Sequence, residues 1–236
     1  SQGELQLGTA EYRGQEKKVY FASDKDRARH LYVIGQTGTG KSTLVNLLLG
    51  ESLMPSTTNE NENAVIRIAY PTEASLNNQA IIEYIDETTE QTSIQEANIL
   101  IDKATRKEED NQRVKNIKYV TFYLKNPKLK EIELINTPGM NVLTEDFYPK
   151  VKHLFSEADV ILWVNSSEQI LDKFNSSLIQ RIHSDNNKIV GVITFPDKLY
   201  KQDENVGVTD VVEQFIQNIE ENRLIRVNEK IGLFIL

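Results

Sequence analysis

The run GQTGTGKST at positions 35–43 carries the residue types that bind phosphate groups. Its spacing is G-x-x-x-x-G-K-[ST], with Gly35, Gly40, Lys41 and Ser42 at the fixed positions. Glycine lets the backbone turn tightly, so that successive N–H groups point at one phosphate beside the positive end of a helix. The Lys41 ammonium would reach the β- and γ-phosphates, and the Ser42 hydroxyl would ligate Mg²⁺. The run therefore predicts a site for a nucleoside triphosphate.

The segments on either side of this run have the composition of the elements that must position it. Residues 31–34 (LYVI) predict a buried strand, and residues 43–49 (TLVNLLL) predict a helix. Gly38, Thr39 and Thr43 complete the loop residues that we expect to contact the nucleotide. A glycine-rich turn with a chance lysine is the alternative, and it would not require this strand–loop–helix order.

A second candidate element follows the strand predicted over 131–135, where the sequence reads N-T-P-G. A hydrophobic strand followed by an acid, two residues and a glycine is typical of the γ-phosphate site of regulatory GTPases. The Gly139 N–H would contact that phosphate, and Asn136, at the acid position, would hold Mg²⁺ through water. Because an amide carries no negative charge, the affinity for the metal should fall. An ordinary turn at the end of a strand is the alternative.

A third candidate element lies at the end of the strand predicted over 188–194, where a guanine-reading [NT]-K-x-D motif would fall. We assign Thr194, Asp197 and Lys198 to the nucleotide. Asp197 would accept two hydrogen bonds from guanine that adenine cannot supply. Phe195 stands in place of the usual lysine and could stack on the purine. A strand exit without a ligand is the alternative.

The polar stretch over 51–63 predicts an irregular, mobile loop. Thr58 is the threonine that we expect to close over Mg²⁺ and the γ-phosphate. Thr57 and Asn63 are alternatives for the same position, and a solvated loop without a ligand would have the same composition.

The composition excludes several classes of protein. With 236 residues and a formal net charge of −8, the chain lacks the basic surface of a nucleic-acid-binding protein. Without cysteine it has no disulfides or thiolate metal sites, and its separated histidines have no metal-ligand spacing. No apolar run reaches the roughly 18 residues of a membrane span, and the first residues do not resemble a secretory signal. We expect a cytoplasmic domain, and the apolar run 231–236 suggests a chain that continues further.

Apolar runs alternate with helical patterns, which predicts one α/β domain over 1–236 with a mainly parallel sheet and helices on both faces. An N-terminal extension over 1–29 holds a short hairpin. A charged insertion over 71–117 has two helical patterns, at 77–86 and 94–114. The other predicted strands are 64–70, 117–124, 131–135, 160–164 and 188–194, and the other predicted helices are 147–156, 170–183 and 210–222.

Several stretches together resemble the GTPase domain of dynamin-like proteins. They are GQTGTGKSTLVNLLLGESLMPS, NAVIRIAY, VTFYLKNPKLKEIELINTPGMN and SEADVILWVNSSEQ, in order along the chain. The resemblance implies a P-loop GTPase fold, GTP or GDP with Mg²⁺, GTP hydrolysis, a homodimer across the nucleotide, and membrane remodelling through segments outside this chain. Lys41 would then stabilise the transferred phosphate, while Gln36 or Thr37, helped by Gly139, would orient the attacking water. The loop is also similar to those of septins and immune-associated GTPases.

Two other functions stay open. Asn136 and Phe195 depart from the pattern of dynamin-like proteins, which favours a degenerate switch that binds GTP without hydrolysing it. Residues 26–44 are similar to the nucleotide loop of DNA-pumping motor ATPases. Those motors need a strand ending in Asp-Glu, which no predicted strand here has, and the acidic charge disfavours DNA as a partner.

Overall fold

The computed structural model describes most of the chain, with gaps at both ends and in several internal segments. The described residues are 6–12, 15–20, 30–36, 38–54, 64–139, 155, 157–166, 188–194, 213 and 233–235. The strands are β1 (Gln6–Tyr12), β2 (Gln15–Tyr20), β3 (His30–Gly35), β4 (Val65–Ala69), β5 (Gln79–Tyr84), β6 (Thr89–Ser93), β7 (Ile117–Tyr123), β8 (Glu133–Asn136), β9 (Val160–Ser166), β10 (Lys188–Thr194) and β11 (Leu233–Ile235). The helices are α1 (Lys41–Leu49), α2 (Ile94–Ile101) and α3 (Asn111–Lys115), with short 3₁₀ turns at Ala74–Leu76, Glu108–Asp110 and Pro127–Lys130.

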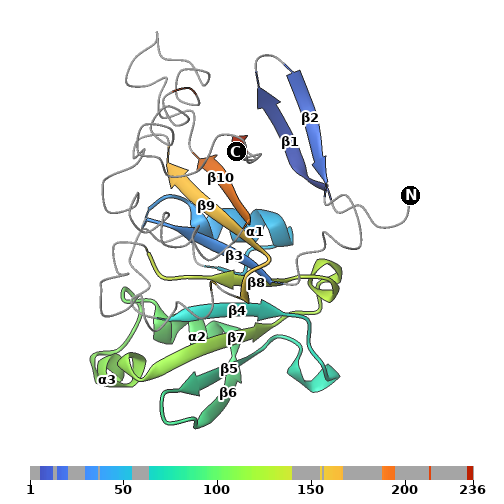
Figure 1. The fold of residues 1–236 in the computed structure, drawn as a ribbon. Coiled ribbons are helices and arrows are strands. Elements are labelled where there is room, and N and C mark those ends of the chain that lie inside the picture. Colours follow the sequence, from blue (N-terminus) through green and yellow to red (C-terminus); the bar gives the residue numbers. More distant parts are fainter. Residues whose placement is uncertain are drawn as a thin grey trace.

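The sheet has nine strands in the order β11-β10-β9-β3-β8-β4-β7-β5-β6 (Figure 1). The strands from β11 to β8 run parallel to one another. The direction reverses between β8 and β4, and β5 is antiparallel to both β7 and β6. The predicted α/β fold with a mainly parallel sheet is therefore confirmed. The change of direction lies between β3, which leads into the glycine-rich loop, and β5 and β6, the strands of the insertion.

The central strand β3 is buried on both faces, which is the reason for its continuous apolar run. Residues 31–34 have no exposed surface. Val33 belongs to one hydrophobic cluster with Val45 of α1 and with residues of α2. Tyr32 points to the opposite face, because neighbouring strand residues alternate, and its ring centroid lies 6.3 Å from that of Phe155. Both faces of the sheet are thus covered.

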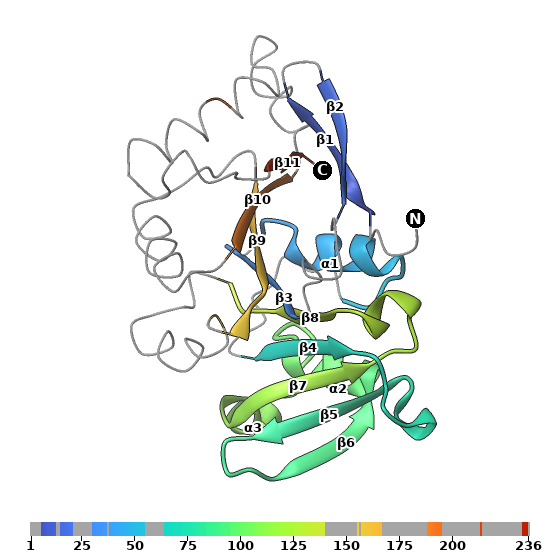
Figure 2. The same ribbon diagram turned by 45° about the vertical axis from the view of Figure 1, so that its right-hand side comes forward.

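The N-terminal hairpin is a separate two-stranded sheet, with β1 antiparallel to β2 (Figure 2). The sequence predicts its strands at 5–7 and 19–21 around a turn at 9–15, whereas residues 9–12 belong to β1 and pair with β2. The predicted helices over 147–156, 170–183 and 210–222 lie almost wholly outside the described residues. None of the helices in the described part of the chain is long and apolar enough to cross a membrane.

The insertion differs from the prediction in its first half. The helix predicted over 77–86 is wrong, since this segment forms β5. Ala80 and Ile82 are buried, whereas Gln79, Ile81 and Glu83 are only half-buried. The alternation has the period of a strand. Pairing with β7 and β6 on its two sides stabilises this conformation. Strand β6 was not predicted either, because its sequence TEQTS has no apolar residue.

The second predicted helix of the insertion, over 94–114, is divided into two. Helix α2 ends at Ile101, after which Asp102 is extended and accepts a hydrogen bond from the Ala104 N–H at 2.9 Å. Helix α3 begins at Asn111. The buried carboxylate of Asp102 therefore helps to end α2 by accepting a hydrogen bond from a backbone N–H outside the helix.

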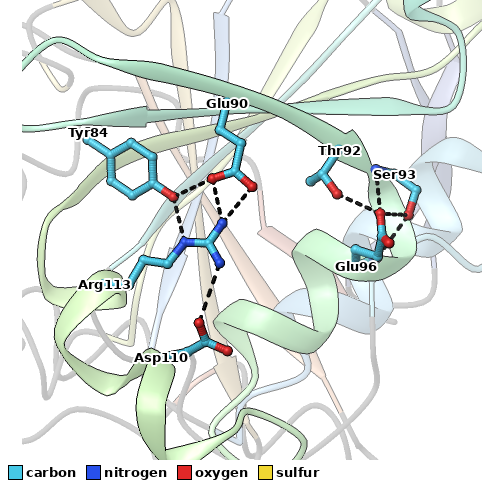
Figure 3. Close-up of polar contacts among 7 residues, drawn as sticks. All are labelled: Tyr84, Glu90, Thr92, Ser93, Glu96, Asp110 and Arg113. Carbon is cyan, nitrogen blue, oxygen red and sulfur yellow. Dashed lines mark hydrogen bonds and ion pairs between the residues drawn. The ribbon is translucent and has the colours of Figure 1, made fainter.

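Polar contacts fix α3 against the strand pair of the insertion (Figure 3). The Arg113 guanidinium donates to the Tyr84 hydroxyl at 2.8 Å and to Glu90 at 2.6 Å, and it also pairs with Asp110 at 3.4 Å. The Tyr84 hydroxyl donates to Glu90 at 2.9 Å. Since each group contacts at least one other, α3, β5 and β6 form one unit at the edge of the sheet.

Candidate nucleotide-binding site

The glycine-rich loop joins the end of β3 to the start of α1, as the sequence predicts. Gly38 and Gly40 have φ angles of 80° and 82°, in the left-handed region that glycine adopts without strain. Gly40 is the N-cap of α1, and no side chain among the described residues caps the helix there. The N–H groups of the first turn are thus free of side-chain caps at the positive end of the helix, which is the arrangement that binds an anion.

Gly35 is required because the loop passes close to the neighbouring strand. Strand β9 pairs Val164 with Gly35, and a Cβ atom on Gly35 would lie 2.3 Å from the Val164 carbonyl oxygen. The same atom would lie 2.9 Å from the Thr39 hydroxyl. Only glycine fits at this position, so the loop and β9 are held together at one point.

Lys41 lies at the first position of α1, with its side chain folded back over the loop. Its Nζ donates to the carbonyl oxygens of Gly35 at 2.7 Å and Gln36 at 2.9 Å. Burial lowers the pKa of Lys41 to about 7. The ammonium group is therefore positioned beside the loop, where the negative charge of a phosphate would favour its protonated form.

The pKa of Lys41 predicts how nucleotide affinity depends on pH. The free protein loses this proton above about pH 7, whereas the triphosphate complex retains it because phosphate charge raises the pKa. Nucleotide binding then takes up a proton, so affinity should fall above pH 7, by up to about tenfold per pH unit. Calorimetry in buffers of different ionisation enthalpy would measure this uptake. Deprotonation of the γ-phosphate has the opposite effect on binding, but this group is already ionised at about pH 8. Affinity that rises with pH above that value would contradict the prediction.

Asn136 lies at the end of β8, directly beside the strand that leads into the loop. It pairs with Val33, and the Thr137 N–H donates to the Val33 carbonyl at 3.2 Å. Asn136 is 5% exposed, and its Oδ1 atom has no hydrogen-bond donor among the described residues. A buried acceptor without a partner is unfavourable unless another group supplies the donor. The site therefore fits a hydrated cation or another donor next to Asn136.

Thr194, at the end of β10, contacts the loop itself. Its Oγ1 lies 2.6 Å from the Thr39 carbonyl oxygen and 3.1 Å from that of Asn165, and its proton can be donated to either. The Thr39 hydroxyl in turn donates to the Gln36 carbonyl at 2.8 Å. Thr194, Thr39 and Asn165 are all buried. The hydroxyl of Thr194 thus supports the loop from behind, a role that the sequence did not predict.

Replacing Thr194 with valine tests this support. Valine has the same shape and no hydroxyl, so the buried Thr39 and Asn165 carbonyls lose a shared donor, which should lower the free energy of unfolding by about 1–3 kcal/mol. Nucleotide affinity should also fall. Urea denaturation and fluorescent GTP titration measure the two effects. Thr194→Ser keeps the hydroxyl and should retain most of the stability and most of the nucleotide affinity. Equal losses of stability and affinity in the valine and serine variants would contradict the prediction.

The other predicted site residues divide into two groups. Ser42 and Thr43 lie in the first turn of α1 with partly exposed side chains, and Gly139 is buried just after β8. Thr37, Thr58, Asp197 and Lys198 lie outside the described residues, as do the alternatives Thr57 and Asn63. Within the described ranges, no three His, Cys, Asp or Glu side chains are grouped so that they could hold a metal ion.

Two further polar side chains have structural roles. Arg67 on β4 donates from Nε to Glu133 at 2.6 Å and lies 6.0 Å from the Tyr119 ring centroid, so it is engaged within the sheet. Asn46 of α1 accepts hydrogen bonds from the N–H groups of Leu53 and Met54 at 2.9 and 2.8 Å. Asn46 thereby fixes the chain just before the loop predicted to carry Thr58.

Comparisons with known proteins agree with this geometry. Residues 31–196, more than half of the chain, match the dynamin family. Two solved chains belong to an oligomerised bacterial dynamin pair that provides a mechanism for long-range sensing and tethering of membranes. The first has a TM-score of 0.58 and 22% identity over 89% of this chain, and the second has a TM-score of 0.64 and 16% identity over 92%. At these identities the likeness shows the fold, and this chain spans only 31% and 34% of their lengths. The match covers the glycine-rich loop and most of the sheet around it, so the chain belongs to the dynamin family and is a dynamin-like GTPase domain.

Proposed function

We propose that this domain binds GTP with Mg²⁺ and hydrolyses it to GDP. The observation that carries the proposal is Lys41, whose ammonium group lies over the loop carbonyls at the uncapped start of α1. A triphosphate in this position would contact Lys41 and the N–H groups of the loop together. We assign guanine selection to Asp197, because it lies where the aspartate of an [NT]-K-x-D motif would accept two hydrogen bonds from guanine.

The residues of the chain supply positioning and charge. Lys41 would neutralise charge that develops between the β- and γ-phosphates, and Gln36 or Thr37 would orient water with the help of the Gly139 N–H. Ser42, Thr58 and Asn136 would hold Mg²⁺. The Oδ1 of Asn136, to which no described residue donates a hydrogen bond, fits this role. When bound, the ion would supply charge stabilisation at the phosphate oxygens.

We further propose that two domains dimerise across the nucleotide and that this contact activates hydrolysis. Catalysis of this type depends on positioning, so an isolated domain would be slow until a second copy completes the site. Action at a membrane, through segments outside this sequence and from the cytoplasmic side, follows from the family and from the membrane tethering described for the bacterial dynamin pair.

A second candidate function is a GTP-binding switch without turnover. Asn136 favours it, because the amide lacks the charge that a carboxylate would bring to the metal. Titration of fluorescent GTP and ATP with and without Mg²⁺ tests binding, and phosphate release at increasing protein concentration tests turnover and dimerisation. No difference between GTP and ATP would contradict the guanine assignment, and tight GTP binding without phosphate release at any concentration would favour the switch.

Replacing Asn136 with aspartate should raise the affinity of the nucleotide complex for Mg²⁺ by about tenfold, because a negative charge then faces the cation. Without metal, the buried carboxylate should destabilise the free protein. Thermal unfolding with nucleotide in EDTA and in Mg²⁺ measures both effects. Asn126→Asp is a matched control, since Asn126 is buried next to Leu49 at the far end of α1, and its destabilisation should not depend on Mg²⁺. The same Mg²⁺ dependence in both variants would refute the role of Asn136.

A further inference from the structure

Strand β6 forms one edge of the nine-stranded sheet, so only one of its sides is paired within the described residues. It is the outermost strand of the sheet in Figures 1 and 2, and α2 lies behind the sheet rather than beyond β6. Four strands separate it from β3, which places it about 24 Å from the strand that leads into the glycine-rich loop. The β6 edge is therefore distinct from the nucleotide site.

The backbone of β6 alternates between its paired side and its outer side. The Tyr84 N–H donates to the Thr88 carbonyl at 2.9 Å, which closes the turn between β5 and β6. Because hydrogen-bonded pairs occur at every second residue of an antiparallel ladder, the N–H and C=O groups of Thr89 and Gln91 point away from β5. Both residues are exposed, and no described residue bonds to these outward groups. They are thus available to another strand.

Strand β6 lacks the features that normally prevent an edge strand from pairing. Its sequence TEQTS contains no lysine, proline or glycine, and it pairs with β5 without a bulge. Its one charged residue, Glu90, lies on the face toward α3, where the Arg113 guanidinium donates to it at 2.6 Å (Figure 3). An incoming strand would therefore meet no uncompensated charge on β6.

Both ends of β6 are fixed before any partner binds. At one end the Tyr84 hydroxyl donates to Glu90 at 2.9 Å. At the other end Ser93 and Glu96 form a reciprocal capping box, and the Thr92 hydroxyl also donates to Glu96 at 2.6 Å (Figure 3). A preformed edge binds a partner without the entropic cost of its own ordering.

The side chains of β6 favour a second copy of the same strand as the partner. In an antiparallel pair with a two-fold axis at Gln91, the facing pairs are Gln91–Gln91, Glu90–Thr92 and Thr89–Ser93. None of these pairs brings like charges together, and pairs of hydroxyl side chains stabilise neighbouring strands. An axis one residue earlier would place Glu90 opposite Glu90, which is unfavourable. The sequence of β6 is thus complementary to itself in one register.

A strand from another protein would find less to recognise on this edge. Where an added strand is bound specifically, pockets for its alternate side chains supply the specificity. Neither the pocket beside α2 nor the pocket beside α3 is lined by Thr89, Glu90 or Gln91. Self-pairing needs no such pocket, because each contact occurs twice about the axis, as in the two-fold dimers that are the commonest homo-oligomers.

We propose that β6 is an interaction surface for a second copy of this chain, which adds its own β6 in antiparallel orientation about a two-fold axis at Gln91. The two Gln91 residues exchange N–H···O=C hydrogen bonds, and the sheets of the two copies become continuous. Since few hydrogen bonds hold the pair, its dissociation constant should be about 0.1–1 mM. The pairing does not involve the nucleotide site, so it is compatible with the dimer proposed across the nucleotide.

The absence of cysteine from the chain allows a direct test by disulfide trapping. Facing residues of a hydrogen-bonded antiparallel pair have Cα atoms about 5.5 Å apart, which a disulfide can span. In the nucleotide-free chain, Gln91→Cys should therefore form a covalent dimer under mild oxidation about tenfold faster than Gln95→Cys. Gln95 is a matched control because it is exposed on α2, outside the edge. Non-reducing electrophoresis measures both rates.

Charge variants at the same position test the two-fold axis. Gln91→Lys and Gln91→Glu each bring like charges face to face, so each alone should weaken self-association of the nucleotide-free chain by about three- to fivefold in sedimentation equilibrium. An equimolar mixture of the two should restore the association, because opposite charges then meet. Gln95→Lys makes the same change of net charge away from the edge and should have no effect. Circular dichroism checks that all variants fold.

Several results would overturn the proposal. They are a wild-type chain that stays monomeric at about 1 mM, equal cross-linking of the two cysteine variants, and a mixture of the charge variants that associates no better than either alone. Slow hydrogen exchange of the Thr89 and Gln91 amides in dilute protein would also overturn it, because another segment of the same chain would then cover the edge. None of these measurements uses nucleotide, so their failure is separate from a failure of GTP binding.

Discussion

Lys41→Ala should lower the affinity for GTP by about 100-fold or more. The substitution removes the one ammonium group that the structure places over the loop, 2.7 Å from the Gly35 carbonyl and 2.9 Å from that of Gln36. Hydrogen bonds between a charged donor and a phosphate contribute about 1.5–3 kcal/mol each, and Lys41 would make more than one of them. Titration with a fluorescent GTP analogue measures the loss.

A second lysine, which contacts the same helix from the 3₁₀ turn at Pro127–Lys130, supplies the control. The Lys128 Nζ donates to the Leu48 carbonyl at 2.6 Å, at the C-terminal end of α1, so it too is a lysine bound to backbone oxygen. Lys128→Ala should leave GTP affinity within about twofold of the original, because the phosphate interaction depends on the N-terminal end of the helix. Equal losses in the two variants would mean that the phosphates do not bind near Lys41.

Gly35→Ala should destabilise the domain by about 3 kcal/mol or more and should also prevent tight nucleotide binding. The added methyl group would lie 2.3 Å from the Val164 carbonyl oxygen, which belongs to the backbone of β9 and cannot rotate away. Either the glycine-rich loop or β9 must move. A shift of the loop would displace the N–H groups and Lys41 that are expected to bind the phosphates. Urea denaturation measures the free energy of unfolding.

Gly38→Ala distinguishes the steric clash from the conformational effect of losing a glycine. Gly38 has a φ of 80° and would place no Cβ within 4 Å of another atom. Its replacement by alanine should lower the free energy of unfolding by about 1–2 kcal/mol, because a residue with a Cβ atom is strained in the left-handed conformation. If Gly38→Ala destabilises the domain as much as Gly35→Ala, the close approach of Gly35 to Val164 is not the reason for the glycine.

The local sequence was sufficient to predict a structural feature where one continuous segment of the chain forms all of it. The strand before the loop, the loop itself and helix α1 were all predicted from residues 31–49, and the structure has them at these positions. Glycine, lysine and a buried apolar run each restrict the backbone locally, so the signal needs no other part of the chain. The positions of five later strands along the chain were also predicted from their apolar runs, namely β4, β7, β8, β9 and β10.

The insertion shows where this reasoning failed. The segment 77–86 contains polar and apolar residues that fit a helix about as well as a strand. Its conformation is decided by hydrogen bonds to β7, whose residues lie about 40 positions further along the chain. Strand propensity depends on such neighbours more than helix propensity does, so the choice could not be made from the segment alone.

The sequence by itself therefore determined the position of the glycine-rich loop, the helix that follows it and the family resemblance, because these depend on residues that are adjacent in the chain. Only the tertiary structure decided that Thr194 supports Thr39 from 155 residues away, and that Asn136 lies beside Val33 with an acceptor to which no described residue donates. These arrangements depend on which strands become neighbours in the sheet, and strand order is a property of the whole fold.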